Sequence, residues 1–199
     1  MRIVGGRHRG RRLLAPPGDI VRPTSDRARE ALFNILSHGR LTAEGVPFAD
    51  AVVLDAFAGT GALGLEALSR GAAEALFIEQ DREALVILRR NIAALGEDAQ
   101  ARIIAGDATR PPRAPSACGL VFIDPPYRSG LAAPALAALD AAGWLMPGAL
   151  AILELAAREE LAPPTGFILL DERVYGAARL LFFRRETASA IATERSPSE

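Results

Sequence analysis

Short apolar runs recur along residues 51–184, and polar or glycine-containing stretches separate them. Runs of four to six mainly apolar residues have the length expected of buried strands. Between several of them, apolar residues recur every three or four positions, which is the spacing of helices with one buried face. The apolar runs predict strands over 51–54, 75–78, 101–105, 120–123 and 150–155.

This alternation of strands and helices predicts an α/β fold with a doubly wound, mostly parallel sheet and right-handed crossover connections. Two further runs, 167–174 and 177–184, are joined at Tyr175-Gly176. They predict an antiparallel hairpin at the C-terminal edge of the sheet, which brings the expected number of strands to seven. Helices are expected over about 24–37, 62–70, 82–95 and 132–142.

Composition divides the chain into three parts. Residues 1–22 are rich in arginine and glycine, and we expect them to form a small hairpin-like arm around Gly5-Gly6 to Gly10. Residues 23–186 contain the alternating pattern and are numerous enough to bury one hydrophobic core. Residues 187–199 are small and polar, which predicts a flexible tail.

Charge is unevenly distributed along the chain, although the net charge is only −1. Residues 1–30 hold eight arginines and three acidic residues, so this segment is basic and the remainder is acidic. A basic arm on an acidic body is typical of proteins that bind a polyanion, and a merely solvated basic terminus is the alternative. The candidate contacts are Arg2, Arg7, Arg9, Arg11, Arg12 and Arg22.

Several classes of protein are disfavoured by the sequence. No apolar run approaches the ~20 residues that a membrane span needs, and the N-terminus lacks the apolar core of a secretion signal. The single cysteine, Cys118, excludes an internal disulfide and a cysteine-based zinc site. We therefore expect a cytoplasmic protein that does not enter a membrane.

Acidic residues follow four of the predicted strands, at the end where open α/β sheets bind ligands. The first, Asp55, begins a loop that contains Gly59 and Gly61, where the backbone can approach a ligand closely. A carboxylate here would repel a pyrophosphate but suits a ligand with a cation, such as an amino group or a sulfonium. A tight turn between strand and helix is the alternative.

Two further strands suggest contacts to a nucleoside. Glu79 lies eighteen positions after Gly61, where nucleoside-binding folds hold ribose hydroxyls, unless it is a solvated loop acid. Asp107 could accept a hydrogen bond from an adenine amino group, with Ala108 offering its backbone. A helix-capping role for Asp107 is the alternative.

The fourth strand end is the sequence Asp124-Pro125-Pro126-Tyr127. Proline cannot extend a strand ladder, so the two prolines end the strand and stiffen the backbone that follows it. A carboxylate, a carbonyl without competing backbone donors and an aromatic ring are thereby held in one small region. A rigid turn with a packed tyrosine is the alternative for this motif taken alone.

The order of these motifs resembles the class I S-adenosylmethionine-dependent methyltransferases. Asp124-Pro125-Pro126-Tyr127 matches a motif of enzymes that methylate exocyclic amino groups of nucleic-acid bases. Over roughly residues 1–185 the chain is similar to the RsmD family of 16S rRNA guanine-N2 methyltransferases. The matching segments are 22–34, 55–67, Ile3-Val4-Gly5-Gly6 and Gly143-Trp144-Leu145.

This resemblance implies a Rossmann-like methyltransferase domain over 23–186, with S-adenosylmethionine as the cofactor and no metal. The implied catalytic motif is Asp124, Pro125, Pro126 and Tyr127, with Asp124 and the Pro125 carbonyl accepting amino hydrogens and Tyr127 stacking on an extruded base. The implied cofactor-binding residues are Asp55, Phe57, Ala58, Gly59, Thr60, Gly61, Glu79, Gln80, Asp107, Ala108 and Thr24.

The resemblance also implies a partner, which is 16S rRNA or a small-subunit assembly intermediate. The arginines of the arm would contact its phosphates without reading sequence, and the protein would act as a monomer. Two other functions stay open. One is an amino methyltransferase that acts on adenine N6 or on another nucleic acid, and the other is an inactive RNA-binding module.

Overall fold

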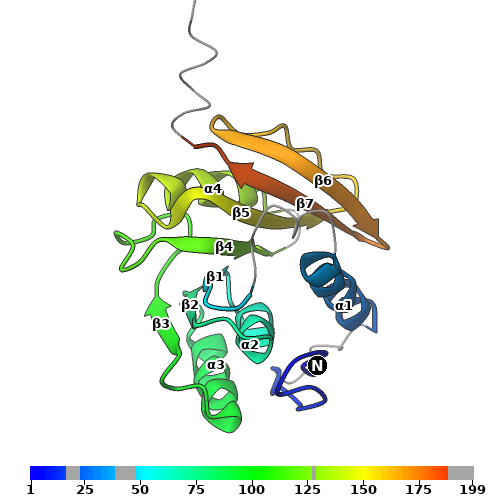
Figure 1. The fold of residues 1–199 in the computed structure, drawn as a ribbon, viewed down its shortest axis with the longest axis vertical. Coiled ribbons are helices and arrows are strands. Elements are labelled where there is room, and N and C mark those ends of the chain that lie inside the picture. Colours follow the sequence, from blue (N-terminus) through cyan, green and yellow to red (C-terminus); the bar gives the residue numbers. More distant parts are fainter. Residues whose placement is uncertain (17–22, 39–47, 127–128, 188–199) are drawn as a thin grey trace, which may run out of the picture.

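The computed structural model describes residues 1–16, 23–38, 48–126 and 129–187. Its centre is a seven-stranded sheet with the strand order β3-β2-β1-β4-β5-β7-β6 (Figure 1). Strands β1 to β5 are parallel, and β7 pairs antiparallel with both β5 and β6. The strands are β1 (Val52–Ala56), β2 (Glu74–Glu79), β3 (Ala101–Ala105), β4 (Cys118–Ile123), β5 (Leu145–Ala156), β6 (Phe167–Tyr175) and β7 (Ala178–Arg185).

Helices cover both faces of the sheet because side chains of a strand alternate between the two faces. Val53 and Leu120 pack with one cluster, whereas Leu54 and Val121 pack with the other. The first cluster includes residues of α1 (Pro23–His38), α2 (Ala62–Ser69) and α3 (Arg82–Leu95), and the second includes α4 (Ala132–Ala141). The doubly wound, mostly parallel sheet predicted from the sequence is therefore confirmed.

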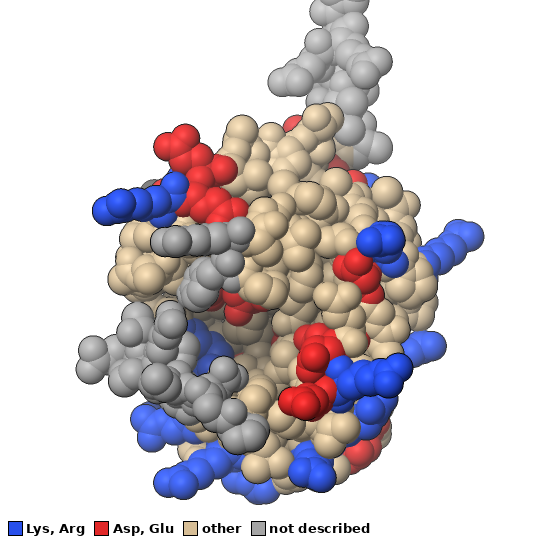
Figure 2. Space-filling model, turned by 180° about the vertical axis from the view of Figure 1, so that it is seen from behind, with Lys and Arg blue, Asp and Glu red and all other residues tan. Residues whose placement is uncertain are grey.

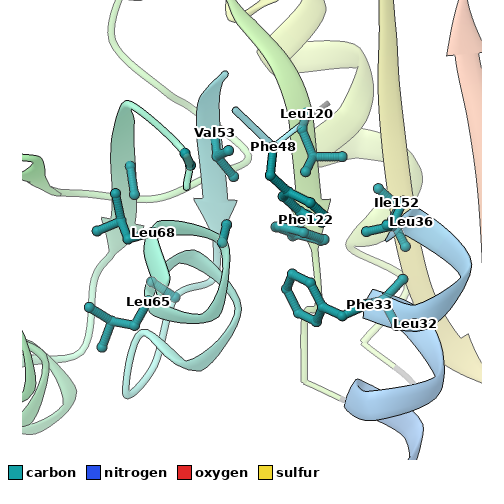
Figure 3. Packing of buried hydrophobic residues seen from close by; sticks show 14 of the residues in the cluster. Leu32, Phe33, Leu36, Phe48, Val53, Leu65, Leu68, Leu120, Phe122 and Ile152 are labelled. Carbon is teal, nitrogen blue, oxygen red and sulfur yellow. The ribbon is translucent and has the colours of Figure 1, made fainter. Parts of the chain in front are cut away.

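Aromatic and aliphatic side chains pack α1 against β4 and β5 (Figure 3). The ring of Phe33 stacks on Phe48 at 5.5 Å between centroids and lies 5.6 Å from the ring of Phe122 in β4. Leu36 of α1 and Ile152 of β5 belong to the same buried cluster. Large buried aromatic rings are a major source of core stability, so this contact fixes the position of α1 on the sheet.

The N-terminal arm is a short hairpin packed against the body of the protein. The Ile3 amide donates to the Arg11 carbonyl at 2.9 Å, and the Gly10 amide donates back to the Ile3 carbonyl at 2.9 Å. Ile3 is almost completely buried in the same cluster as α1 and α2. At Gly6, a Cβ atom would lie 1.9 Å from the Ser69 carbonyl oxygen, so only glycine allows this approach to α2.

The observed elements match the predicted ones closely, with β5 as the main exception. The sequence predicts a strand from Leu150, but β5 begins at Leu145 and passes through Pro147 and Gly148. The pairing of β4 with β5 shifts register between Cys118 and Leu120, and the extra residues lie on β5. In the described ranges no helix is long and apolar enough to span a membrane. The predicted tail lies outside these ranges except for Thr187.

Candidate active site

The parallel pairing of β1 to β4 brings the acidic residues at their ends to one edge of the sheet. Ala56 of β1 pairs with Ile78 of β2 and with Ile123 of β4, so Glu79 and Asp124 follow at the same level. Glu79 in turn pairs with Ala105, shortly before Asp107. This edge, at the carboxyl ends of the strands, is where ligands bind in open α/β sheets.

Asp55 is buried in β1, with only 2% of its side chain exposed. Its Oδ2 atom accepts a hydrogen bond from the Gly64 amide of α2 at 2.9 Å. Burial raises the pKa of Asp55 to about 7 and the nearby Glu79 adds to the rise, although the Gly64 hydrogen bond opposes it. A cation next to Asp55 would stabilise its ionised form, which fits the ligand expected at this position.

Glu79 holds the glycine loop against the end of β2. Its Oε2 atom accepts from the Gly59 amide at 2.7 Å, and its Oε1 atom accepts from the amides of Gln80 and Asp81 at 2.8 and 2.7 Å. A carboxylate fixed by three backbone donors is rigid. Its Oε2 atom accepts only one of these bonds and keeps a lone pair that could accept from a ribose hydroxyl.

The loop that connects β1 to α2 has an unusual backbone. Phe57 has a φ of 64°, a left-handed conformation that costs a bulky residue energy and is found most often at functional sites. Gly59 has a φ of 54°, and a Cβ atom built there would meet nothing closer than 4.0 Å. The loop therefore presents open backbone at Gly59, as the predicted close approach of a ligand requires.

Thr60, in the same loop, contacts α3 and the N-terminal arm. Asn91 of α3 donates from Nδ2 to the Thr60 carbonyl at 2.9 Å, and it also bonds both backbone groups of Leu14. The Thr60 hydroxyl contacts the Met1 sulfur at 3.4 Å. The loop and the arm thus share one buried anchor, which the sequence analysis did not identify.

Asp107 closes a local turn after β3. Its Oδ1 atom accepts from the amide and the hydroxyl of Thr109, at 2.8 and 2.7 Å, and these bonds lower its pKa. The neighbouring Ala108 is buried. No helix begins between β3 and β4 in this described part of the chain, so the helix-capping alternative is not what the structure shows. Contact of Asp107 or Ala108 with an adenine stays a prediction.

Asp124 stands between two other carboxyl groups. Its side chain keeps some exposure, but the protein around it desolvates the carboxyl, and Glu154 and Asp55 add negative charge. These causes raise the pKa of Asp124 well above its usual value. Pro125 is buried and Pro126 is exposed. Tyr127, Arg22 and the side chain of Thr24 lie outside the described residues.

The candidate RNA-binding arginines fall into two groups. Arg7 is ion-paired with the buried Glu97 at 2.5 Å and bonds Gln100, and Arg11 donates to the Ala94 carbonyl at 2.6 Å. These two attach the arm to the C-terminal end of α3. The second group keeps exposed side chains without such contacts to the described residues, and it consists of Arg2, Arg9 and Arg12.

Comparison with known proteins adds a family to this geometry. A family model described as "Conserved hypothetical protein 95" matches residues 1–184. An Escherichia coli K12 protein named ribosomal RNA small subunit methyltransferase D is 39% identical over 94% of this chain and 90% of its own length. The chain belongs to the RsmD family. A Haemophilus influenzae protein of the same name is 35% identical over 88% of the chain and 89% of its own length.

Solved structures support membership of the RsmD family and its Rossmann-like class I methyltransferase fold. Escherichia coli YhhF superimposes with a TM-score of 0.79 at 40% identity, over 94% of this chain and 98% of its own. A hypothetical protein from Thermus thermophilus superimposes with a TM-score of 0.72 at 34% identity, over 94% and 99%. This RsmD-family protein is therefore a methyltransferase.

Viewed from behind, the surface has a hollow with acidic side chains in its wall and arginines around it (Figure 2). The acidic residues at four strand ends could be predicted from the sequence. Glu154, which the structure brings next to Asp124, was not predicted. A signal was present, because Glu154 is the one charged residue in the apolar run 149–156.

Proposed function

We propose that this protein transfers a methyl group from S-adenosylmethionine to the N2 amino group of a guanine in small-subunit rRNA, in the cytoplasm. The observation that carries the proposal is Asp124, placed before two prolines on the same face of the sheet as Asp55. The names of the two curated relatives support rRNA as the acceptor. The resemblance of the Asp124-Pro125-Pro126-Tyr127 motif to that of amino methyltransferases implies that the acceptor is an amino group of a base.

The residues of the loop and of β2 fit the proposed cofactor. Asp55 provides a buried negative charge for a cationic ligand, Glu79 provides an acceptor for a ribose hydroxyl, and Gly59 leaves open space at the backbone. When bound, S-adenosylmethionine supplies a methyl group that is already activated on a sulfonium, so the protein has to position rather than activate it.

The protein's own contribution is made at the acceptor amino group. The lone pair of a guanine amino nitrogen is delocalised into the ring, so the nitrogen is a weak nucleophile. The Asp124 carboxylate and the Pro125 carbonyl each accept one amino hydrogen, which favours tetrahedral geometry and localises the lone pair. The hydrogen bond from the amino group also favours the ionised form of Asp124, and the surplus proton of the methylated nitrogen leaves to solvent after transfer.

The experiment that tests the function is transfer of a labelled methyl group to small-subunit rRNA, both free and partly assembled, followed by mapping of the modified base. Label is expected on the N2 atom of one guanine. Label on adenine N6, or on DNA alone, would show that another amino methyltransferase activity is correct. Absence of transfer to every acceptor, with the cofactor bound, would favour the inactive RNA-binding module.

The variant Asp124→Ala tests the assignment of the catalytic residue. Removal of a preorganised electrostatic group typically costs about 100-fold or more in turnover, and we expect at least that loss. Binding of S-adenosylmethionine, measured by calorimetry, should stay within a few-fold of the wild type. The control Asp98→Ala removes an exposed carboxylate and should leave both quantities unchanged. Near-normal turnover of Asp124→Ala would contradict the mechanism.

A further inference from the structure

Glu154 occupies the position on β5 that corresponds to Asp124 on β4. Ile123 pairs with Leu153, so Asp124 and Glu154 are the next residues on the two neighbouring strands. Phe122 and Ile152, two positions earlier, both belong to the cluster under α1. Because side chains two positions apart share a face, Glu154 lies on the same side of the sheet as Asp124.

The surroundings of Glu154 on β5 are unfavourable for a carboxylate. Glu154 follows five buried residues, 149–153, and is only partly exposed itself. Phe122 and Ile152, which pack in one cluster with Phe33 (Figure 3), precede the two acids by two positions on their strands. Glu154 is also close enough to Asp124 to act on its carboxyl group electrostatically. A carboxylate has about four acceptor sites, so Glu154 can accept a hydrogen bond from a ligand group beside Asp124 in addition to its other interactions.

The order of the acidic residues across the sheet gives Glu154 a place in the proposed reaction. Glu79 and Asp55, on β2 and β1, lie on the cofactor side, and Asp124 on β4 faces the amino group. Glu154 on β5 is one strand further from the cofactor. Neighbouring strands are about 4.8 Å apart, so a group bound at Asp124 can extend to β5.

Guanine has the donors that such a pair of acids would bind. Its N2 amino group and its N1–H group are adjacent donors on one edge, and flipped bases are read by hydrogen bonds to this edge. Adenine has an acceptor at N1, which a carboxylate repels. We infer that Glu154 accepts a hydrogen bond from guanine N1–H, and that it selects guanine while Asp124 holds the amino group.

This inference rests on the proposed function, and its test uses an acceptor that separates the two acids. 2-Aminopurine keeps the amino group at C2 but has an unprotonated acceptor at N1. Small-subunit rRNA is prepared with guanine or 2-aminopurine at the mapped target, by ligation of a synthetic segment, and is assembled into particles if free RNA is not accepted. The measured quantity is the ratio of kcat/KM for the two acceptors.

The wild type should prefer guanine by about tenfold or more, which is the discrimination expected from a lost base contact. In Glu154→Gln the amide can donate to the N1 acceptor of 2-aminopurine, so the preference should fall to near one or reverse. The control Glu160→Gln removes an exposed carboxylate beyond the end of the same strand and should keep the wild-type ratio. A purely structural role of Glu154 would lower activity on both acceptors equally.

The outcomes distinguish this inference from the function on which it rests. If the wild type methylates guanine N2 and the ratio in Glu154→Gln is unchanged, the assignment of Glu154 is wrong and the function stands. If Glu154→Gln does not fold, a wild-type ratio near one still overturns the inference. If label never reaches guanine N2, the proposed function fails and the role of Glu154 fails with it.

Discussion

In the absence of a ligand, burial makes the ionised form of Asp55 unfavourable in the folded protein. Its pKa of about 7 means that the folded protein binds a proton there under conditions in which the unfolded chain does not. Stability therefore falls as pH rises from the ordinary pKa of Asp to about 7, and is then constant with respect to this group. A bound cation would reverse the effect by favouring the carboxylate.

Asp55→Asn should remove this pH dependence. The amide oxygen can still accept from Gly64 without carrying a charge. We expect the free energy of unfolding of the variant to increase relative to the wild type between pH 4 and pH 7, by up to about 4 kcal/mol for a shift of this size. Urea denaturation of the ligand-free proteins at several pH values measures the difference. The exposed control Asp98→Asn should show no such trend, and a flat difference for Asp55→Asn would contradict the pKa.

For single residues, the sequence predicts where each lies in the fold better than it predicts which groups surround it. Asp55, Glu79, Asp107 and Asp124 could be located because each follows a recognisable strand. The turn that Asp107 forms with Thr109 depends on local backbone geometry, which strand periodicity does not contain. Glu154 was missed because its importance depends on which strand lies next to β5, and pairing is a property of the folded sheet.

The glycines at the start of α2 show how one motif serves two purposes. Of Gly59, Gly61 and Gly64, only Gly59 faces open space. At Gly61 a Cβ atom would lie 2.3 Å from a Leu88 methyl carbon, and at Gly64 it would lie 2.3 Å from the Phe77 ring. Sequence spacing suggested close approach to a ligand for this loop. Two of the three glycines instead let α2 pack closely against β2 and α3.

Gly64→Ala should consequently destabilise the protein without acting directly on the ligand. The added methyl group must displace the rigid ring of buried Phe77, and overpacking of this kind costs about 1–3 kcal/mol. Urea denaturation measures the loss. Gly106→Ala is the matched control, because the Cβ atom at Gly106 would meet nothing within 4 Å and its φ is not in the left-handed region. Equal stability of the two variants would contradict the packing argument.

Element boundaries were predictable where apolar runs end in glycine, as in β3 and α3, whereas β1 and β2 continue through the acids Asp55 and Glu79. Boundaries were not predictable in β5. Pro147 and Gly148 normally interrupt a strand. Here Cys118 of β4 pairs with Leu145 before them, and the ladder resumes beyond them where Leu120 pairs with Leu150. A bulge of this kind depends on the partner strand, so no reading of residues 145–150 alone could have found it.

The whole molecule combines an acidic ligand edge with a basic arm docked at its side. The arm is joined to α3 by Arg7 and Arg11, and Arg2, Arg9 and Arg12 are exposed. We expect these three to contact the proposed RNA. Net charge along the sequence predicted a basic surface. It could not tell an arginine that binds the protein from one that faces solvent, because the partner Glu97 is 90 positions away from Arg7.

The double variant Arg9→Ala and Arg12→Ala tests the exposed group. Each phosphate contact that is lost should reduce the slope of log affinity against log salt by about 0.7–0.9, and rRNA binding at moderate salt should weaken several-fold. Filter binding over a salt series measures both. Arg158→Ala, an exposed arginine near the end of β5, serves as the control. An unchanged slope in the double variant would exclude these two arginines from the interface.

The separation between Arg7 and Glu97 also determines the order of events when the protein is made. A ribosome adds about 5–20 residues per second, so about 5–20 s pass between synthesis of Arg7 and synthesis of its partner. The arm thus emerges before α3, and it must wait for α3 before it can dock. During every round of translation its arginines are uncovered beside the RNA of the ribosome that is producing them.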